Sequence, residues 1–446
     1  MHFRRVRRGP LRAGVVTAAL TAATCGLASP ALATGPVSPA PASGTPYLAT
    51  SNSQQSIKQL VQCGNTMYAV GRIWKVLQNG STYWRNNMFS FSASAPYTMS
   101  SLNVDVNGIV NSIAFTSGGG CGHAYIGGTF TKVNGQAANN IAEINTSTGA
   151  LVTSFGHSAD STVETVTGFG SHLLVGGQFT EINGSNHYRY VSLSPTTGKN
   201  DGFINLHVAG WLAGSDQPGV YHQQLSHTGN LMLVEGNFTS VSSQRRQQIF
   251  MVNLNGPQAT LTKWTSPEFN QECVSVENYY IRAAAWSPDD STVYVADTGD
   301  HLINRKQGSY PLTGLCDAAA AFPATQTTVS HKWIDYTGCD SYYSVAADDG
   351  AVYVAGHPRW ADNPDGCNFA GPGAIADPGL QGLDPGTGHV QTSGGSPVYS
   401  MSRANADDML ITSAGLWIAS TNRYGSNWCS GATNHSGICL LPYPTG

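Results

Sequence analysis

Short apolar segments alternate with turn-forming residues from about residue 56 to the end of the chain. The stretch "AYIGGTFTKVNG", residues 124–135, returns as "LLVGGQFTEING", residues 173–184. Further copies of this stretch begin at Tyr68, Leu233, Tyr294, Tyr353 and Trp417. A fixed internal period is the first guide to the architecture, because each repeat forms one structural unit.

Every copy has the same internal order of elements. A short apolar segment such as "VNSIAF" comes first, then a turn rich in Gly, Asp or Ser, the repeated stretch, and a further segment such as "NIAEIN". Runs of β-branched and aromatic residues between turn formers are typical of antiparallel strands. Seven such units with four short strands each predict an all-β fold, a seven-bladed β-propeller of four-stranded antiparallel blades. A β-sandwich with accidental internal similarity is the alternative.

The predicted blades lie near residues 56–108, 109–162, 163–218, 219–276, 277–339, 340–399 and 400–446. Residues 47–50 are expected to complete the last blade beside "ICLLP", which would close the ring. The Gly-Gly pairs of the repeat fit a place where neighbouring sheets approach too closely for a Cβ atom. The Phe two residues later would fill the space between blades.

The N-terminal segment is predicted to direct export. Residues 1–33 hold a basic start, a short apolar stretch and the small-residue site Ala31-Leu32-Ala33, which is typical of a cleaved signal peptide. The apolar stretch is shorter than the roughly 20 residues that span a bilayer, so a membrane-spanning anchor is not expected. Residues 34–46, rich in Pro, Ser and Gly, are expected to form a disordered linker. The predicted location is extracellular.

Charge and cysteine content narrow the function classes. Residues 1–33 contain five arginines and no acidic residue, so their removal takes the net charge from −4 to −9 and disfavours a nucleic-acid partner. Eight cysteines remain, and an even number in an exported chain predicts four disulfides. A thiolate metal site would need closely spaced pairs. The sequence leaves the pairing open among Cys63, Cys121, Cys273, Cys316, Cys339, Cys367, Cys429 and Cys439.

Two cysteine pairs nevertheless stand out. Cys63 and Cys121 occupy matching places in the repeat, and Cys429 and Cys439 could close one loop.

The repeat also resembles a known family. The wording "YIGGTFTKVNG…NIAEIN…STG" is similar to secreted bacterial β-propeller repeats, common in actinobacteria, that have no assigned activity. The resemblance is close in the second and third copies, partial in the first and fourth, and weak afterwards. In the fifth copy, "VYVADTGDHLINR" resembles an NHL-type propeller repeat. The resemblance implies fold and export, and it implies no chemistry because propellers host many functions.

A ligand site is predicted at one end of the central channel. In a propeller, the first strand of each blade lines the channel and starts at the face that carries the loops between second and third strands. Counting back from each repeated stretch places one residue of each blade near that entrance: Lys58, Asn111, Glu164, His222, Arg282, Tyr343 and Asp407, with Asp408 beside the last of them. The alternative is that these polar residues bind no ligand and are only hydrated by water in the channel.

No catalytic residue is assigned, and an enzymatic function is not favoured. If the protein is an enzyme, Glu164 and Asp407 could act as an acid/base pair, with His222 and Arg282 stabilising a developing negative charge. The chain lacks the G-x-S-x-G nucleophile motif. Too few histidines fall in the predicted ring for a metal site, so neither a metal nor a cofactor is expected.

Tryptophans form the second candidate group of ligand-binding residues. Trp74, Trp84, Trp360 and Trp428 fall in or beside loops between second and third strands. An exposed indole suits stacking on a sugar ring, because its face is apolar and its N–H remains a donor. Hydrophobic capping of the blades is the alternative role.

The sequence therefore predicts a secreted binding module whose partner is an extracellular glycan or a cell-surface polymer. A glycan hydrolase or lyase with its site at the channel mouth is one alternative. A protein-interaction scaffold is the other.

Overall fold

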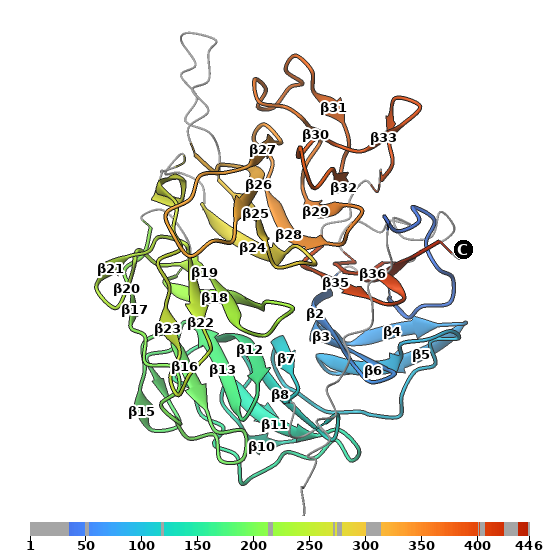
Figure 1. Cartoon of the computed structure of the whole chain (residues 1–446). Coiled ribbons are helices and arrows are strands. Elements are labelled where there is room, and N and C mark those ends of the chain that lie inside the picture. Colours follow the sequence, from blue (N-terminus) through green and yellow to red (C-terminus); the bar gives the residue numbers. More distant parts are fainter. Residues whose placement is uncertain are drawn as a thin grey trace, which may run out of the picture. The chain divides into compact units, whose positions relative to one another are not determined.

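The repeats of the sequence form a series of antiparallel sheets, drawn in Figure 1. In seven of them, consecutive strands pair in meander order, and the second strand carries the repeated stretch. The computed structural model describes residues 35–49, 53–116, 120–212, 217–270, 273, 279–299, 314–399, 401, 406–422 and 436–444. These residues belong to one compact unit, and the predicted signal peptide lies outside the described residues.

The strands of the seven sheets have the following bounds. The first sheet contains β2 (Ser56–Cys63), β3 (Thr66–Arg72) and β6 (Met88–Ser92), and the second contains β7 (Val110–Ala114), β8 (His123–Gly128) and β11 (Ile141–Asn145). The third contains β12 (Val163–Phe169), β13 (His172–Gly177) and β16 (Tyr190–Leu193), and the fourth contains β18 (Gly219–Leu225), β19 (Leu231–Asn237), β22 (Ile249–Asn253) and β23 (Thr260–Leu261). The fifth contains β24 (Tyr280–Trp286), β25 (Thr292–Thr298), β26 (Ala318–Pro323) and β27 (Trp333–Tyr336). The sixth contains β28 (Tyr342–Ala347), β29 (Val352–Gly356) and β32 (Leu380–Leu383), and the seventh contains β35 (Asp408–Thr412), β36 (Gly415–Ala419) and β37 (Ile438–Pro442).

Short strands in the connections make up the rest. They are β1 (Tyr47–Leu48), β4 (Lys75–Gln78), β5 (Ser81–Trp84), β9 (Lys132–Val133), β10 (Gln136–Ala137), β14 (Glu181–Ile182), β15 (Ser185–Asn186), β17 (Val208–Ala209), β20 (Ser240–Val241), β21 (Gln244–Arg245), β30 (Trp360–Ala361), β31 (Ile375–Ala376), β33 (Thr392–Ser393) and β34 (Ser396–Pro397). Within the described part of the chain, the one helical element is the 3-10 turn η1 (Pro267–Asn270).

The predicted four strands per sheet are present in full only in the fourth and fifth sheets. In four other sheets, the fourth segment contributes an isolated bridge, namely Phe91 to Met99, Ile144 to Leu151, Leu193 to Asn200, and Leu383 to Val390. An edge segment needs few ladder hydrogen bonds because nothing pairs with its outer side, and a short edge also limits unwanted pairing with other chains.

The first strands of the seven sheets contact one another in a closed cycle, and Figure 1 shows them around a common centre. The contacts run from β2 to β7, β12, β18, β24, β28 and β35, and β35 contacts β2 again. Hydrogen bonds cross between these strands: the N–H of Ile113 donates to Gln59 Oε1 at 2.7 Å, and the N–H of Leu60 donates to Asp408 Oδ2 at 2.9 Å. This all-β arrangement is that of a β-propeller-like scaffold.

The N-terminal segment differs from the sequence expectation. Residues 47–48 form β1, which pairs with β4 and not with β37. Residues 38–42 lie along β37 instead, since the N–H groups of Ser38 and Ala42 donate to the carbonyls of Pro442 and Leu440. The segment expected to be a disordered linker is held by Val37, whose apolar side chain is buried.

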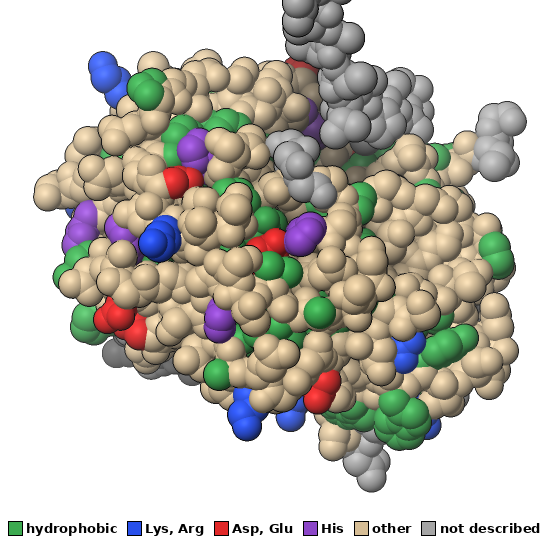
Figure 2. All heavy atoms as spheres, turned by 90° about the horizontal axis from the view of Figure 1, so that it is seen from below, with side chains coloured by type: hydrophobic (Ala, Val, Ile, Leu, Met, Phe, Trp, Pro, Cys, Tyr) green, Lys and Arg blue, Asp and Glu red, His purple; other side chains and the backbone are tan. Residues whose placement is uncertain are grey.

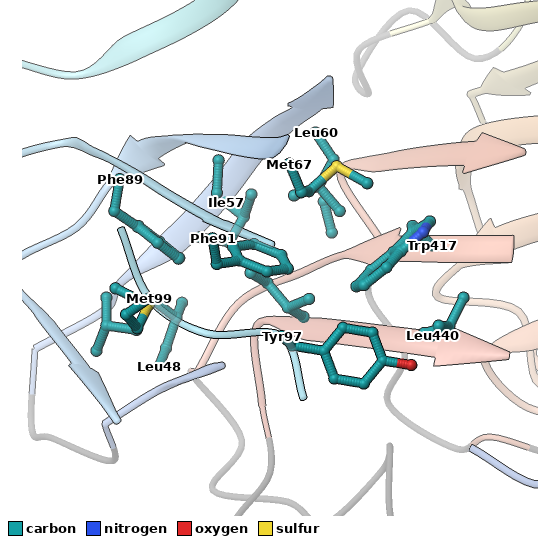
Figure 3. Packing of buried hydrophobic residues seen from close by; sticks show 14 of the residues in the cluster. Leu48, Ile57, Leu60, Met67, Phe89, Phe91, Tyr97, Met99, Trp417 and Leu440 are labelled. Atoms are coloured by element: carbon teal, nitrogen blue, oxygen red, sulfur yellow. The ribbon is translucent and has the colours of Figure 1, made fainter. Parts of the chain in front are cut away.

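Close packing between neighbouring sheets explains why the same residues recur in the repeats of this chain. A Cβ added to Gly176 would lie 2.5 Å from Cγ1 of Val220 in the next sheet, and Gly127 faces Val163 in the same way. Phe130 and Phe179 are fully buried. Between the seventh and first sheets, Trp417 packs against Phe91 with ring centroids 5.7 Å apart, as Figure 3 shows.

Three disulfides link described residues: Cys63–Cys121, Cys273–Cys316 and Cys339–Cys367. The first joins the first and second sheets through the matching places noted in the repeat. Cys439 is also disulfide-bonded, and Cys429 lies outside the described residues. No helix within the described ranges is long and apolar enough to span a bilayer.

Candidate functional site

The first strand of each of six sheets contains a β-bulge at the same place. The register with the second strand shifts once per sheet, and the extra residues are Lys58, Asn111, Glu164, Tyr221, Arg282 and Tyr343. A bulge inserts one residue into a strand and re-aims its side chain. In the seventh sheet, Asp407 stands at the corresponding position, directly before β35.

A glycine on the second strand makes room for most of these bulges. A Cβ added to Gly71, Gly128, Gly177, Gly236 or Gly356 would overlap the carbonyl oxygen two residues before the bulged residue. The second glycine of the Gly-Gly pair therefore has a different task from the first, which faces the neighbouring sheet. In the fifth sheet, Asp297 occupies this position opposite Ile281.

The structure brings all seven predicted entrance residues together around one cavity of about 270 Å³, here called the entrance cavity. Its lining consists of Lys58, Asn111, Glu164, Gln178, Gln217, Tyr221, His222, Tyr280, Arg282, Tyr343 and Asp407. These seven side chains therefore lie together at one end of the channel. Asp408 does not line the entrance cavity and lies further along the channel.

In the fourth sheet, the predicted His222 and its neighbour Tyr221 both line the entrance cavity. The bulged residue of the fourth sheet is Tyr221, and His222 is the next residue along β18. Each bulge directly follows a large, buried side chain, as in Val163-Glu164 and Val220-Tyr221. Aligning on that apolar residue would have identified Tyr221. Gln178 and Tyr280 were missed because they flank the counted positions.

The ionic and amide groups of the entrance cavity are paired with each other. Lys58 Nζ lies 3.0 Å from Asp407 Oδ1 and thereby joins the first and seventh sheets. The amide of Asn111 donates to Glu164 Oε2 at 2.7 Å, and the amide of Gln178 donates to Glu164 Oε1 at 2.9 Å. Both carboxylates of the hypothetical acid/base pair are thus engaged by donors.

Aromatic rings form the other side of the entrance cavity. The guanidinium of Arg282 lies 4.3 Å from the ring centroid of Tyr343 and 5.6 Å from that of Tyr280. The Tyr221 and Tyr280 rings are 5.3 Å apart. Such cation–π and ring contacts hold the arginine in place while leaving its N–H donors available for hydrogen bonds.

His222 borders both the entrance cavity and the cavity behind it. Burial, together with the positive charges of Arg282 and Lys58, lowers the pKa of His222 to about 4. The imidazole is therefore neutral at pH 7, although channel water reaches it, and it does not provide the positive charge expected of it in the enzyme hypothesis.

Three of the four predicted tryptophans lie in described connections between second and third strands. Trp84 is 66% exposed, and Lys75 Nζ lies 5.6 Å from its ring centroid. Trp360 is half-buried beneath Arg359, whose Cζ atom is 4.6 Å from the ring centroid. Trp74 is half-buried and lines a separate cavity between the first two sheets. Trp428 lies outside the described residues.

Further exposed aromatic residues lie in connections at the same end of the sheets. Tyr188, Trp211 and Phe369 are about half exposed or more. Tyr188 and Phe369 fall between second and third strands, and Trp211 falls between the third sheet and the start of β18. In an antiparallel meander, both kinds of connection lie at the end where the first strands begin. The opposite face, where first and second strands join, carries none of the large hydrophobic residues found exposed in the described ranges.

The second cavity, here called the inner cavity, has a volume of about 400 Å³ and is lined by the first strands beyond their bulges. Asp408 lines it, and burial raises the pKa of this carboxyl to about 6 despite the hydrogen bond from Leu60. Among the described residues, no group of three or more His, Cys, Asp or Glu side chains is arranged to hold a metal ion.

Comparisons with known proteins concern the fold. No family model and no curated protein matches the chain. The solved structures that it resembles include U3-55K (TM-score 0.49, 10% identity, covering 90% of this chain and 99% of that chain) and the WD40 repeats of RRP9 (TM-score 0.48, 12% identity, 91% and 99%). The WD40 β-propeller domain of Doa1 has a TM-score of 0.46 at 12% identity, covering 89% of this chain and 95% of that chain. The RRP9 and Doa1 structures are WD40 domains by name, and the sequence resemblance to a secreted bacterial repeat family has no matching family model.

Proposed function

We propose that the protein is a secreted, seven-bladed β-propeller that binds an extracellular glycan or cell-wall polymer at its entrance face. The observation that carries this proposal is the convergence of seven first-strand positions on one cavity, with exposed aromatic side chains in the loops of the same face. The blade number is supported by the seven meander sheets and by the closed cycle of contacts between their first strands.

The chemistry of the entrance face suits a neutral or weakly charged carbohydrate. A sugar presents an apolar ring face and several hydroxyls, which aromatic rings and paired polar groups can meet together. The entrance cavity offers amides, tyrosines and one arginine, and Trp84 adds an exposed indole. Only 11% of all residues in the chain are charged, and Figure 2, a view at 90° to Figure 1, shows charged side chains scattered over the side of the molecule.

Export is the second part of the proposal. Three disulfides between described residues are consistent with a secreted protein, because thiols stay reduced in most cytosols. The basic and apolar start of the sequence is consistent with a signal peptide.

A glycan hydrolase or lyase at the same entrance is the alternative. Glu164 and Asp407 both line the entrance cavity, which is what this hypothesis requires. Their engagement by Asn111, Gln178 and Lys58 favours a binding role, because a general acid has to present its proton to the substrate. A protein-interaction scaffold is the remaining alternative.

The deciding experiment incubates the purified protein, from Thr34 onward, with a panel of soluble and insoluble polysaccharides, and scores retention and new chain ends together. Retention without new ends supports the proposal, and it should fall at least tenfold in Arg282→Gln. Lys199→Gln, in a turn at the opposite end of the third sheet, is the matched control and should be retained normally.

Each other outcome has a definite meaning. New chain ends that disappear in Glu164→Gln, in a variant that still melts cooperatively, would establish the enzyme instead. Absence of both retention and cleavage would refute glycan binding and favour a protein partner.

A further inference from the structure

The inner cavity differs in charge from the entrance cavity. Its ionisable lining consists of Glu235, Asp407, Asp408, His222 and His227, and neither lysine nor arginine lines it. The remaining wall combines apolar side chains, among them Phe115, Leu225 and Trp286, with polar ones such as Gln59 and Gln223. The channel therefore passes from a mouth with basic and acidic side chains to an interior lined by acidic side chains and histidines, without lysine or arginine.

Glu235 is the unusual group in this lining. It belongs to β19, its exposed fraction is 0%, and neither carboxyl oxygen has a hydrogen-bond partner. Its cross-strand neighbour is His222, on the channel-lining strand β18. Leaving a buried carboxyl unpaired costs stability, which a protein tolerates most readily where a ligand later meets the group.

The other two carboxyls have defined partners within the chain. Asp407 pairs with Lys58, and Asp408 accepts the N–H of Leu60 through Oδ2. His227 lies 2.9 Å from Asp290 at the far end of the cavity lining. Glu235 is thus the one inner-cavity carboxyl without a partner in the described structure.

We propose that the inner cavity is a second ligand site, which takes an organic ammonium group on an apolar stem and places its charge against Glu235. A carboxylate in a low-dielectric wall attracts a cation strongly, and the apolar side chains of the wall favour a hydrocarbon stem over a hydrated ion. A bound metal ion would need several ligating groups, and the described residues hold no such set. The proposal is independent of glycan binding at the entrance.

Binding of an ammonium ligand at this site is expected to release a proton from Glu235. Burial raises the pKa of Glu235 to about 8, so the free carboxyl is largely protonated at pH 7. An arriving ammonium stabilises the carboxylate, and the displaced proton passes to the buffer. His222 stays neutral at this pH, so it supplies no competing positive charge. Burial, together with the charge of Glu235, raises the pKa of Tyr190, so this phenol stays protonated and supplies no competing negative charge. Binding at pH 7 should therefore release nearly one proton per ligand.

The test is isothermal titration of the folded protein with benzylammonium, with benzyl alcohol as the neutral probe of similar shape. Titrations at pH 7 in two buffers of different ionisation enthalpy count the protons released. We expect binding of benzylammonium with proton release, at least tenfold weaker binding of benzyl alcohol, and at least tenfold weaker binding of benzylammonium to Glu235→Gln, without proton release. Asp377→Asn is the matched control, because Asp377 is also buried and unpaired but lines neither channel cavity.

Several results would overturn the proposal. These are equal binding of the neutral alcohol, unchanged affinity in Glu235→Gln, an equal loss in Asp377→Asn, or displacement of the amine by millimolar calcium. If Glu235→Gln does not fold, two other measurements test the proposal in its place. They are the affinity of Asp408→Asn for benzylammonium and the number of protons that the unmodified protein releases. Loss of glycan retention with intact amine binding, or the reverse, distinguishes failure of one site from failure of the other.

Discussion

The third and fourth sheets have the same meander of strands and the same bulge, yet they differ at one buried position. Gly176 of the third sheet pairs with Thr165 directly after the bulge, and Glu235 of the fourth sheet pairs with His222 at the equivalent place. Gly127 of the second sheet also occupies this position. The second and third sheets therefore have glycine at this position, where packing leaves no space for a side chain, whereas the fourth sheet has glutamate.

The surroundings explain how the two residues are accommodated. A side chain at Gly176 would collide with Val220 and Thr165, so the contact between the third and fourth sheets excludes it. Glu235 lines the inner cavity together with Ala283 and Ala284 of the fifth sheet, whose small side chains leave space. The comparison teaches that a departure from the repeat can reveal a specialised position that no single motif would identify.

The largest expected effect on stability comes from adding a side chain at Gly176 of the third sheet. Gly176→Val should lower the free energy of unfolding by roughly 3 kcal/mol or more, because the new atoms overlap Val220 at 2.5 Å and the close packing of the sheets leaves them no space. Urea denaturation followed by tryptophan fluorescence measures the loss. Gly386→Val, in an open turn at ordinary backbone angles, is the control and should change stability by less than about 1 kcal/mol. Similar stability of the two variants would mean that the sheets can move apart.

The buried carboxyl of the fourth sheet should make stability depend on pH. Because its folded pKa is about 8 and its unfolded pKa is near 4.5, Glu235 is protonated in the folded chain while it ionises in the unfolded chain. Its contribution is fully present below about pH 4.5 and is lost as the pH rises toward 8, at about 1.4 kcal/mol per unit. Between pH 5.5 and 7.5, Glu235→Gln should therefore gain roughly 2 to 3 kcal/mol relative to the unmodified protein.

Denaturation curves at several pH values measure this difference. Glu181→Gln, at the surface of the third sheet, should run parallel to the unmodified protein. A constant offset between Glu235→Gln and the unmodified protein across the range would show that the carboxyl is ionised in the folded state.

The positions counted back from the repeated stretch fall at or beside the bulges, because the repeat fixes their distance from the second strand. Five of the six bulged residues were chosen by counting, since a short turn joins the two strands and the register then follows. Tyr221 was missed because counting back from Leu233 ended one residue later, at His222. The apolar residue that precedes each bulge is the more dependable anchor.

Other features depend on contacts that no local pattern encodes. The backbone of Val37 holds the N-terminal segment through two tyrosine hydroxyls, from Tyr353 in β29 of the sixth sheet and from Tyr399 in the connection after that sheet, which lie more than 300 residues away. The sequence around Glu235, "LVEGNF", was recognised as a repeat, but its departure from Gly-Gly was not interpreted. Whether a carboxyl is buried and unpaired depends on the facing sheet, which only the folded structure supplies.

The smallest expected effects on stability come from substitutions of the bulged residues. In the second and third sheets, Asn111 and Glu164 are joined by a hydrogen bond of 2.7 Å between neighbouring first strands. A double-mutant cycle with Asn111→Ala and Glu164→Ala should give a coupling energy of about 1 kcal/mol, because channel water weakens a bond to a charged group that would otherwise be stronger.

The fourth sheet provides the matched case. Tyr221 contacts the ring of Tyr280, and Tyr221→Phe keeps that contact, so it should change the free energy of unfolding by no more than about 0.5 kcal/mol. A coupling energy near zero for Asn111 and Glu164 would mean that water replaces their bond at no cost, so that Asn111 is free to turn toward a ligand while Gln178 still donates to Glu164.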